Sequence, residues 1–430
     1  MGLKSMGIYI NRGNSEFRDI VAHEYVDKTS LIPIVNATLN SEKRFSCVTR
    51  CRRFGKSMAA KMLCAYYDKS CHSRELFRGL KAEQDATFEA HLNKYYVICV
   101  DMTDFTTRFR HEKEMVKLIQ DKIINDVLSE FPDVTREEDD DLMEVLYRIS
   151  ERTGERFVMI IDEWDAILRE MGADDYTVTS YVDFLRRLFK GSGSNIVFAG
   201  AYLTGILPIK RYNTESALNN FREYTMINPG RMAASLGFTH QEVEQLCQKF
   251  SMDLPEMERW YDGYRIGNES HIFNPYSVMR AIDDRQYRSY WTSTGAYDSV
   301  VTYIQMNFDG LKDGVIRMLS GEHIYVNTTK FQNDMHAVKS KNDVLTVLIH
   351  LGYLAYDGDT QECYIPNKEV ADEFLNAVED TSWNLLAESI QNSRALLNAT
   401  IAGNEQAVER AIRWRHPSGW HQLRQGDKAT

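Results

Sequence analysis

Arg50-Cys51-Arg52-Arg53-Phe54-Gly55-Lys56-Ser57 ends in Gly-Lys-Ser, the part of a P-loop that binds phosphate. The full P-loop pattern is G-x-x-x-x-G-K-[ST], and Arg50 stands where its first glycine would be. Because that glycine takes positive φ freely, we expect a loop with arginine there to bend differently. The second half of the pattern, which carries most of the phosphate chemistry, is intact.

Each retained residue type has a specific task in nucleotide binding. Gly55 lets the backbone approach phosphate, and the loop amides can cradle phosphate oxygens. Lys56 would reach the β- and γ-phosphates and also serve catalysis, while the Ser57 hydroxyl would bind Mg²⁺. The sequence therefore predicts ATP and Mg²⁺ as cofactors, with the nucleotide bound by Arg52, Arg53, Phe54, Gly55, Lys56 and Ser57.

The flanking segments favour this interpretation. Residues 45–49 are typical of a short strand, and the chain from Ser57 onward is typical of a helix. Its expected apolar face comprises Met58, Met62, Leu63 and Tyr66. The alternative is a chance Gly-Lys-Ser in a turn, which the strand, loop and helix order makes less attractive.

A second motif lies downstream, where the apolar run Phe157–Ile161 leads into Asp162-Glu163. Such a run indicates a buried parallel strand. Asp162 at its end would hold Mg²⁺, directly or through water, and Glu163 would orient or deprotonate the attacking water. The alternative is an ordinary strand end with solvated acids. Asp165 is interpreted as a supporting residue.

Strands alternate with helices through this half of the chain, which predicts an α/β fold with a parallel sheet covered by helices on both faces. Further strands are expected at 96–101, 195–200 and 223–227, and helices at 112–128, 142–152 and 181–189. One expected strand lies in sequence between the P-loop strand and the Asp-Glu strand. This order indicates the additional-strand type of P-loop NTPase. Thr204, after the next strand, is the candidate γ-phosphate sensor; the alternative is a cap or turn threonine.

The C-terminal part predicts a second, mostly helical domain. Thr239-His240-Gln241-Glu242 is a capping box that begins a helix. Residues 344–351 predict a helix that ends at Gly352, and a strand-turn-strand follows to Ile365, which resembles a winged helix. We predict an ATPase domain at 1–230, this helical, winged-helix-like domain at 231–375 and a helical tail at 376–430. Arg265 is one example of an arginine here that could reach the nucleotide.

Composition is that of an ordinary globular protein of 430 residues with 43% hydrophobic and 26% charged residues. No apolar run approaches the ~20 residues of a membrane span, and no signal-peptide core is visible. Seven scattered cysteines without a C-x-x-C pair fit reduced thiols in the cytoplasm and disfavour a zinc site. The net charge of −11 argues against a chain-wide nucleic-acid surface.

Basic residues nevertheless gather around the P-loop. A bound nucleotide is the simplest partner for them, and nucleic acid is the second choice. The cluster comprises Arg44, Arg50, Arg52, Arg53, Lys56 and Lys61.

The order of motifs along the chain resembles the bacterial AAA-ATPase-like family over about residues 6 to 375. The combination is far more specific than any one motif. The motifs are Tyr25-Val26-Asp27-Lys28-Thr29, Arg52-Arg53-Phe54-Gly55-Lys56-Ser57, Ile161-Asp162-Glu163, Thr204-Gly205-Ile206-Leu207, Leu218-Asn219-Asn220-Phe221, Leu236-Gly237-Phe238-Thr239, Trp260-Tyr261-Asp262-Gly263-Tyr264 and Asn274-Pro275-Tyr276-Ser277.

The resemblance implies that an arginine in place of the first P-loop glycine is usual. It also implies an ATPase domain that is usually followed by a PD-(D/E)XK nuclease-like domain. The tail from His416 to Thr430 shows no spaced Asp…Glu-x-Lys on an apolar strand, so we expect a truncated end and a chain that carries the ATPase without a complete nuclease.

Three functions remain open at this point. The first is a Mg²⁺-dependent ATPase that serves as the regulatory or motor module of a nuclease-associated system. The second is a nucleotide-dependent switch with little hydrolysis. The third is a nucleic-acid-binding scaffold that uses the winged-helix-like segment and Lys330, Lys339, Lys341 and Lys368. DNA or a nuclease is a possible macromolecular partner; the oligomeric state is open.

Overall fold

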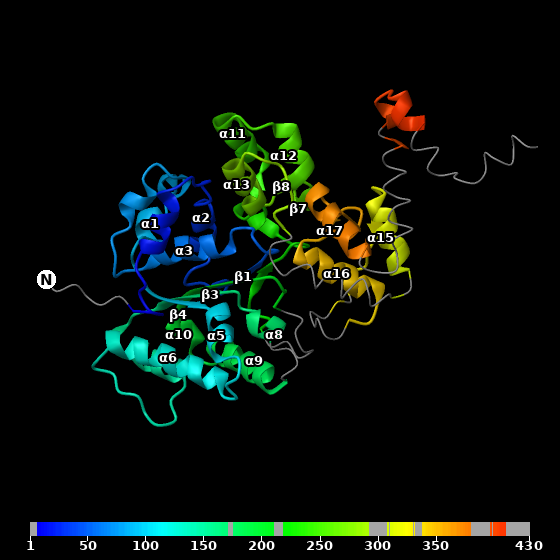
Figure 1. Cartoon of the computed structure of the whole chain (residues 1–430). Helices are drawn as coiled ribbons and strands as arrows, with labels where there is room; N and C mark the ends of the chain where they lie inside the picture. Colours follow the sequence, from blue (N-terminus) through cyan, green and yellow to red (C-terminus); the bar gives the residue numbers. More distant parts are fainter. Residues whose placement is uncertain are drawn as a thin grey trace, which may run out of the picture.

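The computed structural model describes residues 7–170, 175–209, 218–291, 308, 310–329, 331, 338–379, 396–397 and 399–409 (Figure 1). The predicted tail therefore falls largely outside the described residues, as does Lys330. Among the helices in these ranges, none combines the length and apolar character needed to cross a membrane.

A five-stranded parallel sheet forms the centre of the N-terminal half, in the order β2-β3-β4-β1-β5. Its strands are β1 (Phe45–Thr49), β2 (Tyr96–Asp101), β3 (Phe157–Asp162), β4 (Phe198–Gly205) and β5 (Arg222–Tyr224). Strand β4 lies between the P-loop strand β1 and the Asp-Glu strand β3, which confirms the predicted additional-strand arrangement.

The register of the sheet brings its polar carboxyl ends together. Val48 pairs with Thr204 across β1 and β4, and Asp101 pairs with Asp162 across β2 and β3. In an open parallel sheet, ligands bind at this edge of the strands.

Helices cover both faces of the sheet (Figure 1). One face carries α1 (Ser15–Val21), α2 (Leu31–Asn36) and α3 (Lys56–Tyr67), with the short α4 (Phe88–His91). The other carries α5 (Met102–Phe109), α6 (Met115–Glu130), α7 (Leu142–Thr153), α8 (Ala166–Glu170), α9 (Asp175–Lys190) and α10 (Ser194–Val197). Strand β3 serves both cores because its side chains alternate: Val158 and Ile160 face α3, whereas Met159 and Ile161 face the opposite layer.

Three local predictions were wrong. Residues 194–197 form a helical turn instead of the start of a strand, because Gly193 takes φ +99 and begins a turn there. Strand β5 spans 222–224 and not 223–227. Met58, assigned to the apolar face of α3, is 46% exposed.

The C-terminal region is mostly helical, as predicted. It also contains two small antiparallel sheets, of which the sequence predicted only the strand-turn-strand that follows Gly352. Its helices are α11 (His240–Phe250), α12 (Leu254–Tyr261), α13 (Pro275–Asp284), α15 (Leu311–Leu319), α16 (Lys341–Leu351) and α17 (Lys368–Glu379). One sheet joins β6 (Phe238–Thr239), β8 (Glu269–Phe273) and β7 (Tyr264–Ile266), and the other joins β10 (Ala355–Asp357), β11 (Glu362–Tyr364) and β9 (Ile324–Tyr325). The capping box at Thr239 is present in full.

Helix α16, which would be the recognition helix of a winged helix, is buried from Val344 through Leu351. A helix enters the major groove of DNA only with an exposed face. Helix α16 in this arrangement therefore offers no base-reading surface.

Candidate nucleotide-binding site

The P-loop connects β1 to α3, as the sequence predicts. Positive φ occurs at Arg53 (+69°) and at Gly55 (+86°). The Phe54 carbonyl accepts a hydrogen bond from Gly237 N at 3.1 Å, which fixes the loop against the chain that precedes β6.

Arg50, the residue in the first glycine position, is turned inward and is fully buried. Its Nη1 donates to the carbonyls of Thr49 (2.8 Å) and Tyr224 (3.1 Å), and its Nη2 donates to the Met232 carbonyl (3.0 Å). Burial lowers the pKa of Arg50 to about 10. Arg50 therefore ties the end of β1 to β5 and to the 3₁₀ turn at 230–235.

The basic cluster seen in the sequence is consequently divided. Arg44 also points at backbone, with Nη1 donating to the carbonyls of Asn195 and Phe198, both at 3.1 Å. Neither Arg44 nor Arg50 faces the phosphate position, so the prediction that the whole cluster serves phosphate was wrong.

Ser57 and Asp162, the two predicted Mg²⁺ ligands, come together. The Thr204 hydroxyl donates to Asp162 Oδ1. Burial raises the pKa of the Asp162 carboxyl, and the nearby Ser57 and Thr204 hydroxyls oppose the rise. Glu163 N donates to Asp162 Oδ1 at 3.1 Å and to Thr204 Oγ1 at 3.3 Å. Within the described ranges, no cluster of three or more metal-ligating acids, histidines or cysteines occurs. A carboxylate and a hydroxyl nevertheless fit Mg²⁺, which is bound through few protein ligands plus phosphates and water.

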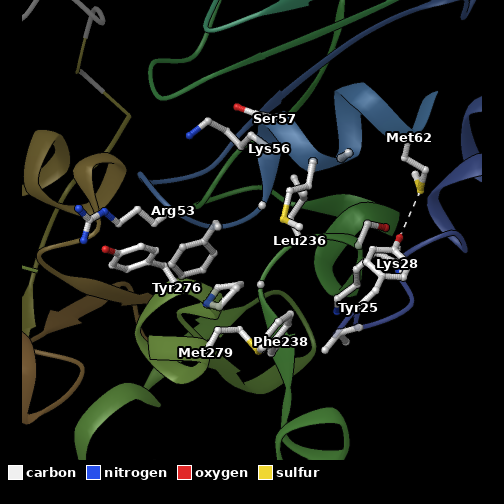
Figure 2. A pocket seen from close by; sticks show the side chains of 18 of the residues that line it. Tyr25, Lys28, Arg53, Lys56, Ser57, Met62, Leu236, Phe238, Tyr276 and Met279 are labelled. Atoms are coloured by element: carbon white, nitrogen blue, oxygen red, sulfur yellow. Dashed lines mark hydrogen bonds between the residues drawn. The ribbon is translucent and has the colours of Figure 1, made fainter. Parts of the chain in front are cut away.

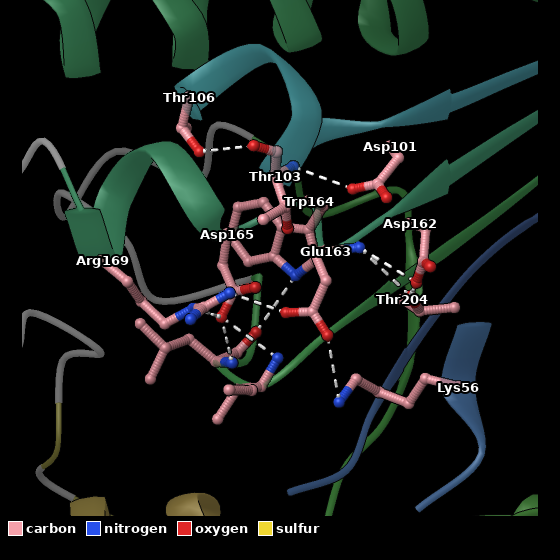
Figure 3. A network of polar contacts seen from close by, with 12 residues as sticks. Lys56, Asp101, Thr103, Thr106, Asp162, Glu163, Trp164, Asp165, Arg169 and Thr204 are labelled. Carbon is pink, nitrogen blue, oxygen red and sulfur yellow. Dashed lines mark hydrogen bonds and ion pairs between the residues drawn. The ribbon is translucent and has the colours of Figure 1, made fainter. Parts of the chain in front are cut away.

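Glu163 lies between two cations (Figure 3). Its Oε1 is 3.2 Å from Lys56 Nζ, and its Oε2 accepts from Arg169 Nη2 at 2.6 Å. Lys56 Nζ also donates to the Cys51 carbonyl at 3.1 Å. Burial alone would raise the pKa of Glu163, but Lys56 and Arg169 outweigh it and lower that pKa. The backbone of Glu163 takes φ +50, which is uncommon for a residue with a side chain.

Asp165 stabilises the turn that carries Glu163. It is fully buried, and its Oδ2 accepts from Ile206 N (3.1 Å) and Leu207 N (2.8 Å). Trp164 N donates to the Thr204 carbonyl at 2.8 Å. The turn after β3 and the chain after β4 are thus fastened to each other, in line with the supporting role expected for Asp165.

The loop opens into a cavity of about 410 Å³. Of the six predicted nucleotide-binding residues, the five from Arg53 to Ser57 line it, and the exposed Arg52 does not. Arg53 is half-buried and turned toward the C-terminal region: its Nη1 donates to the Tyr290 carbonyl at 2.7 Å, and its guanidinium lies 4.0 Å from the Tyr276 ring centre.

The far end of the cavity is apolar and is built from four segments of the chain (Figure 2). Its walls include Tyr25, Met62, Leu236, Phe238 and Met279. The sequence suggested a role here only for the segment at Tyr25. Leu236 and Phe238 belong to the motif Leu236-Gly237-Phe238-Thr239, and the lining residues Pro275 and Tyr276 belong to Asn274-Pro275-Tyr276-Ser277. The resemblance of these two motifs to the family was the available signal.

The wall at Tyr25 is fastened to the C-terminal region by a buried ion pair. Lys28 Nζ lies 2.6 Å from Glu242 Oε2 and donates to the Ala234 carbonyl at 3.0 Å. Arg265, by contrast, pairs with Asp357 and Asp359 and is not among the residues that line the cavity. The suggestion that Arg265 reaches the nucleotide was therefore wrong for this arrangement.

A second cavity of about 300 Å³ lies on the other side of Ser57 and Asp162. Its lining is mixed and includes the charged residues Asp101, Arg12 and Lys61. Ser57 and Asp162 therefore border a cavity of their own beside the P-loop cavity.

These features define a P-loop NTPase of the additional-strand type. Residues 12–214 match the model of the AAA-ATPase-like family, which is described as "Predicted AAA-ATPase".

The chain is also 25% identical over 279 residues to an "Uncharacterized protein in vnfD 5'region" of Azotobacter chroococcum mcd 1. The match covers 63% of this chain and 50% of that protein, so the chain spans about half the length of this relative. Solved structures with some similarity include the ORC2 protein of Aeropyrum pernix in ADPNP-ADP complexes, at 11% identity and TM-score 0.38 over 86% of this chain and 98% of that one. The ORC1 protein of the same organism in complex with DNA is 13% identical, with TM-score 0.29 over 89% and 99%.

Proposed function

We propose that the protein binds ATP with Mg²⁺ and hydrolyses it slowly. The observation that carries this proposal is the cavity that has Lys56 and Ser57 at one end and an apolar wall at the other, with Glu163 at its edge. A triphosphate needs the first end and a purine base suits the second. The match of residues 12–214 to the model of a predicted AAA-ATPase family supports the same function.

Each residue has a task in this proposal. Lys56 and the loop amides bind the phosphates and stabilise the charge that develops during transfer. Ser57 and Asp162 hold Mg²⁺, whose charge would assist the same step. Glu163 orients the attacking water, and Thr204 senses the γ-phosphate through its contact with Asp162.

Calorimetry with Mg²⁺ and ATP on the wild type and on Lys56→Ala tests the proposal. Binding that is lost in Lys56→Ala and kept in Lys69→Ala, a control whose lysine pairs with Glu155 at the surface, is the expected result. A folded wild type that does not bind ATP would refute it.

A nucleotide-dependent switch is the second candidate, because the P-loop is part of the core of the C-terminal region. Phe54 is fully buried, and its ring meets the Tyr264 ring edge-to-face at 5.2 Å. A movement of the loop on ATP binding would therefore shift the packing of β7. Hydrogen exchange of residues 264–291 with and without ATP, in Glu163→Gln, tests this version. Protection that changes with ATP although turnover is lost supports a switch, and unchanged protection excludes it.

We further propose that residues 231–375 form the second domain and that the ATPase acts in the cytoplasm as a module of a nuclease-associated system, with DNA or a nuclease as partner. This finer role follows the family pattern. Binding to duplex DNA that weakens steeply between low and moderate salt would support the DNA partner. The absence of salt-sensitive binding would remove it.

A further inference from the structure

Arg169 is a buried cation beside the proposed catalytic residues, and the motifs in the sequence predicted no role for it. It lies in α8, its side chain is 8% exposed, and it makes two ion pairs. Its Nη2 is 2.6 Å from Glu163 Oε2, and its Nε is 3.2 Å from Asp165 Oδ2. Arg169 is not among the described residues that line either of the two cavities at the site. Any effect on a bound nucleotide must therefore pass through Glu163.

The two oxygens of Glu163 have different partners. Oε1 faces Lys56, which must turn to the phosphates if ATP is to bind, whereas Oε2 faces Arg169, which has no such second task. Once Lys56 has moved, Oε1 lacks a partner and Oε2 keeps one. A carboxylate held by one oxygen presents the other in a fixed direction, which is what a group that orients water requires.

We infer that Arg169 is a positioning residue that holds Glu163 so that Oε1 is left to accept a hydrogen bond from the attacking water. This inference rests on the proposed ATPase function.

The choice of arginine fits this role. A guanidinium presents several donors in a rigid fork, so one side chain contacts both Glu163 and Asp165. Asp165 is in turn held by Ile206 N and Leu207 N. The position of Glu163 is thereby linked to the chain that follows Thr204. A lysine, with a single ammonium group, would contact the two carboxylates less well.

The test compares Arg169→Gln and Arg169→Lys with the wild type in steady-state ATP hydrolysis and in ATP binding. We expect Arg169→Gln to lower kcat by about 10- to 100-fold, as misplacement of a catalytic group does, with ATP affinity changed by less than about threefold. Arg169→Lys should restore part of kcat. In the double variant with Glu163→Gln, turnover should be no lower than in Glu163→Gln alone, because Arg169 acts through Glu163.

Arg136→Gln is the matched control, since Arg136 pairs with Asp121 at 2.7 Å away from the site and its loss should leave kcat unchanged. Thermal melting establishes that each variant is folded. If Arg169→Gln does not fold, Arg169→Lys decides: a kcat several-fold below wild type (about three- to tenfold) with unchanged ATP affinity supports the inference, and a wild-type kcat overturns it.

Other outcomes would also overturn the inference. They are a wild-type kcat in Arg169→Gln, an ATP affinity that falls as far as kcat, and losses that multiply in the double variant. In each case wild-type turnover remains and only the role of Arg169 fails. A wild type that binds ATP without turnover removes the proposed hydrolysis together with this role.

Discussion

Lys56 Nζ lies 3.2 Å from Glu163 Oε1, so the side chains proposed to bind phosphate and to orient water form an ion pair with each other. Both are largely shielded, with 3% and 18% of the side chains exposed. Salt screens such a pair only weakly. Binding of a triphosphate has to replace the carboxylate with phosphate at Lys56, and this exchange opposes binding.

Replacement of Glu163 by glutamine should therefore separate affinity from turnover. Glutamine keeps the shape but removes the charge that competes for Lys56, so we expect ATP to bind about three- to tenfold more tightly, which corresponds to ~1 kcal/mol. Hydrolysis should fall by about 10²- to 10⁴-fold, the usual contribution of a general base. Calorimetry and phosphate release measure the two quantities. Glu155→Gln, which breaks the surface pair with Lys69, is the control. Weaker ATP binding by Glu163→Gln would contradict the prediction.

Arg50 should contribute to stability instead of nucleotide affinity. Its removal leaves three buried carbonyls without their donor, and we expect Arg50→Ala to lower the free energy of unfolding by about 2–4 kcal/mol. Arg50→Gly restores the full P-loop pattern but should be at least as destabilising, because the carbonyls stay unpaired.

Urea unfolding of these variants measures the effect. Arg52→Ala is the matched control from the same loop; Arg52 is exposed, so its loss should change the free energy of unfolding by less than about 0.5 kcal/mol. A neutral Arg50→Ala would show that water satisfies the three carbonyls.

The sheet could be predicted because its signals are local. Residues 45–49 and 157–162 form strands within the predicted bounds, since each is a short apolar run between polar ends. The Asp162, Thr204 and Ser57 grouping follows from strand order, because carboxyl ends of parallel strands share one edge. The start of β4 was misjudged because Ile196 and Val197 are apolar in a helical turn as they would be in a strand.

The rest of the site could not be read from local pattern. The apolar wall joins Tyr25, Phe238 and Met279, which only tertiary packing brings together. The sequence shows that Glu163 follows a strand but not that Lys56 and Arg169 hold its two oxygens. The sequence also does not show that Arg50 turns inward, because an arginine within a P-loop motif is expected to bind phosphate whether it is buried or exposed.

Because one end of the cavity is apolar, we predict that the base of ATP contributes to its binding affinity. Met279 is partly buried and lines this end, away from Lys56. Met279→Ala should weaken ATP binding by about tenfold, or ~1.4 kcal/mol, as expected for lost apolar contact. Binding of inorganic tripolyphosphate, which has no base, should stay unchanged. Calorimetry with both ligands checks this. Equal losses for both ligands would place the base elsewhere.

We predict that Glu369 makes the free energy of unfolding depend on pH. It is the second residue of α17, is 1% exposed, and accepts hydrogen bonds from Ser277 Oγ at 2.8 Å and Tyr290 N at 2.6 Å. Burial raises its pKa from 4.5 to about 7. The folded chain therefore binds more protons than the unfolded chain between these values, so this group lowers the free energy of unfolding as pH rises from about 4.5 to 7. The carbonyl of Tyr290 also accepts a hydrogen bond from Arg53 of the P-loop.

Glu369→Gln should remove this dependence, because the amide stays neutral at every pH. We expect the variant to gain up to ~3 kcal/mol relative to wild type at pH 8 and almost nothing at pH 4.5. Urea unfolding of both proteins across this range measures the difference, in which other titrating groups cancel. Glu256→Gln is the control variant, because Glu256 also lies near the start of a helix but its side chain is 42% exposed. A difference between Glu369→Gln and wild type that is constant with pH would mean that Glu369 titrates near its ordinary pKa, and that the Ser277 and Tyr290 hydrogen bonds offset its burial.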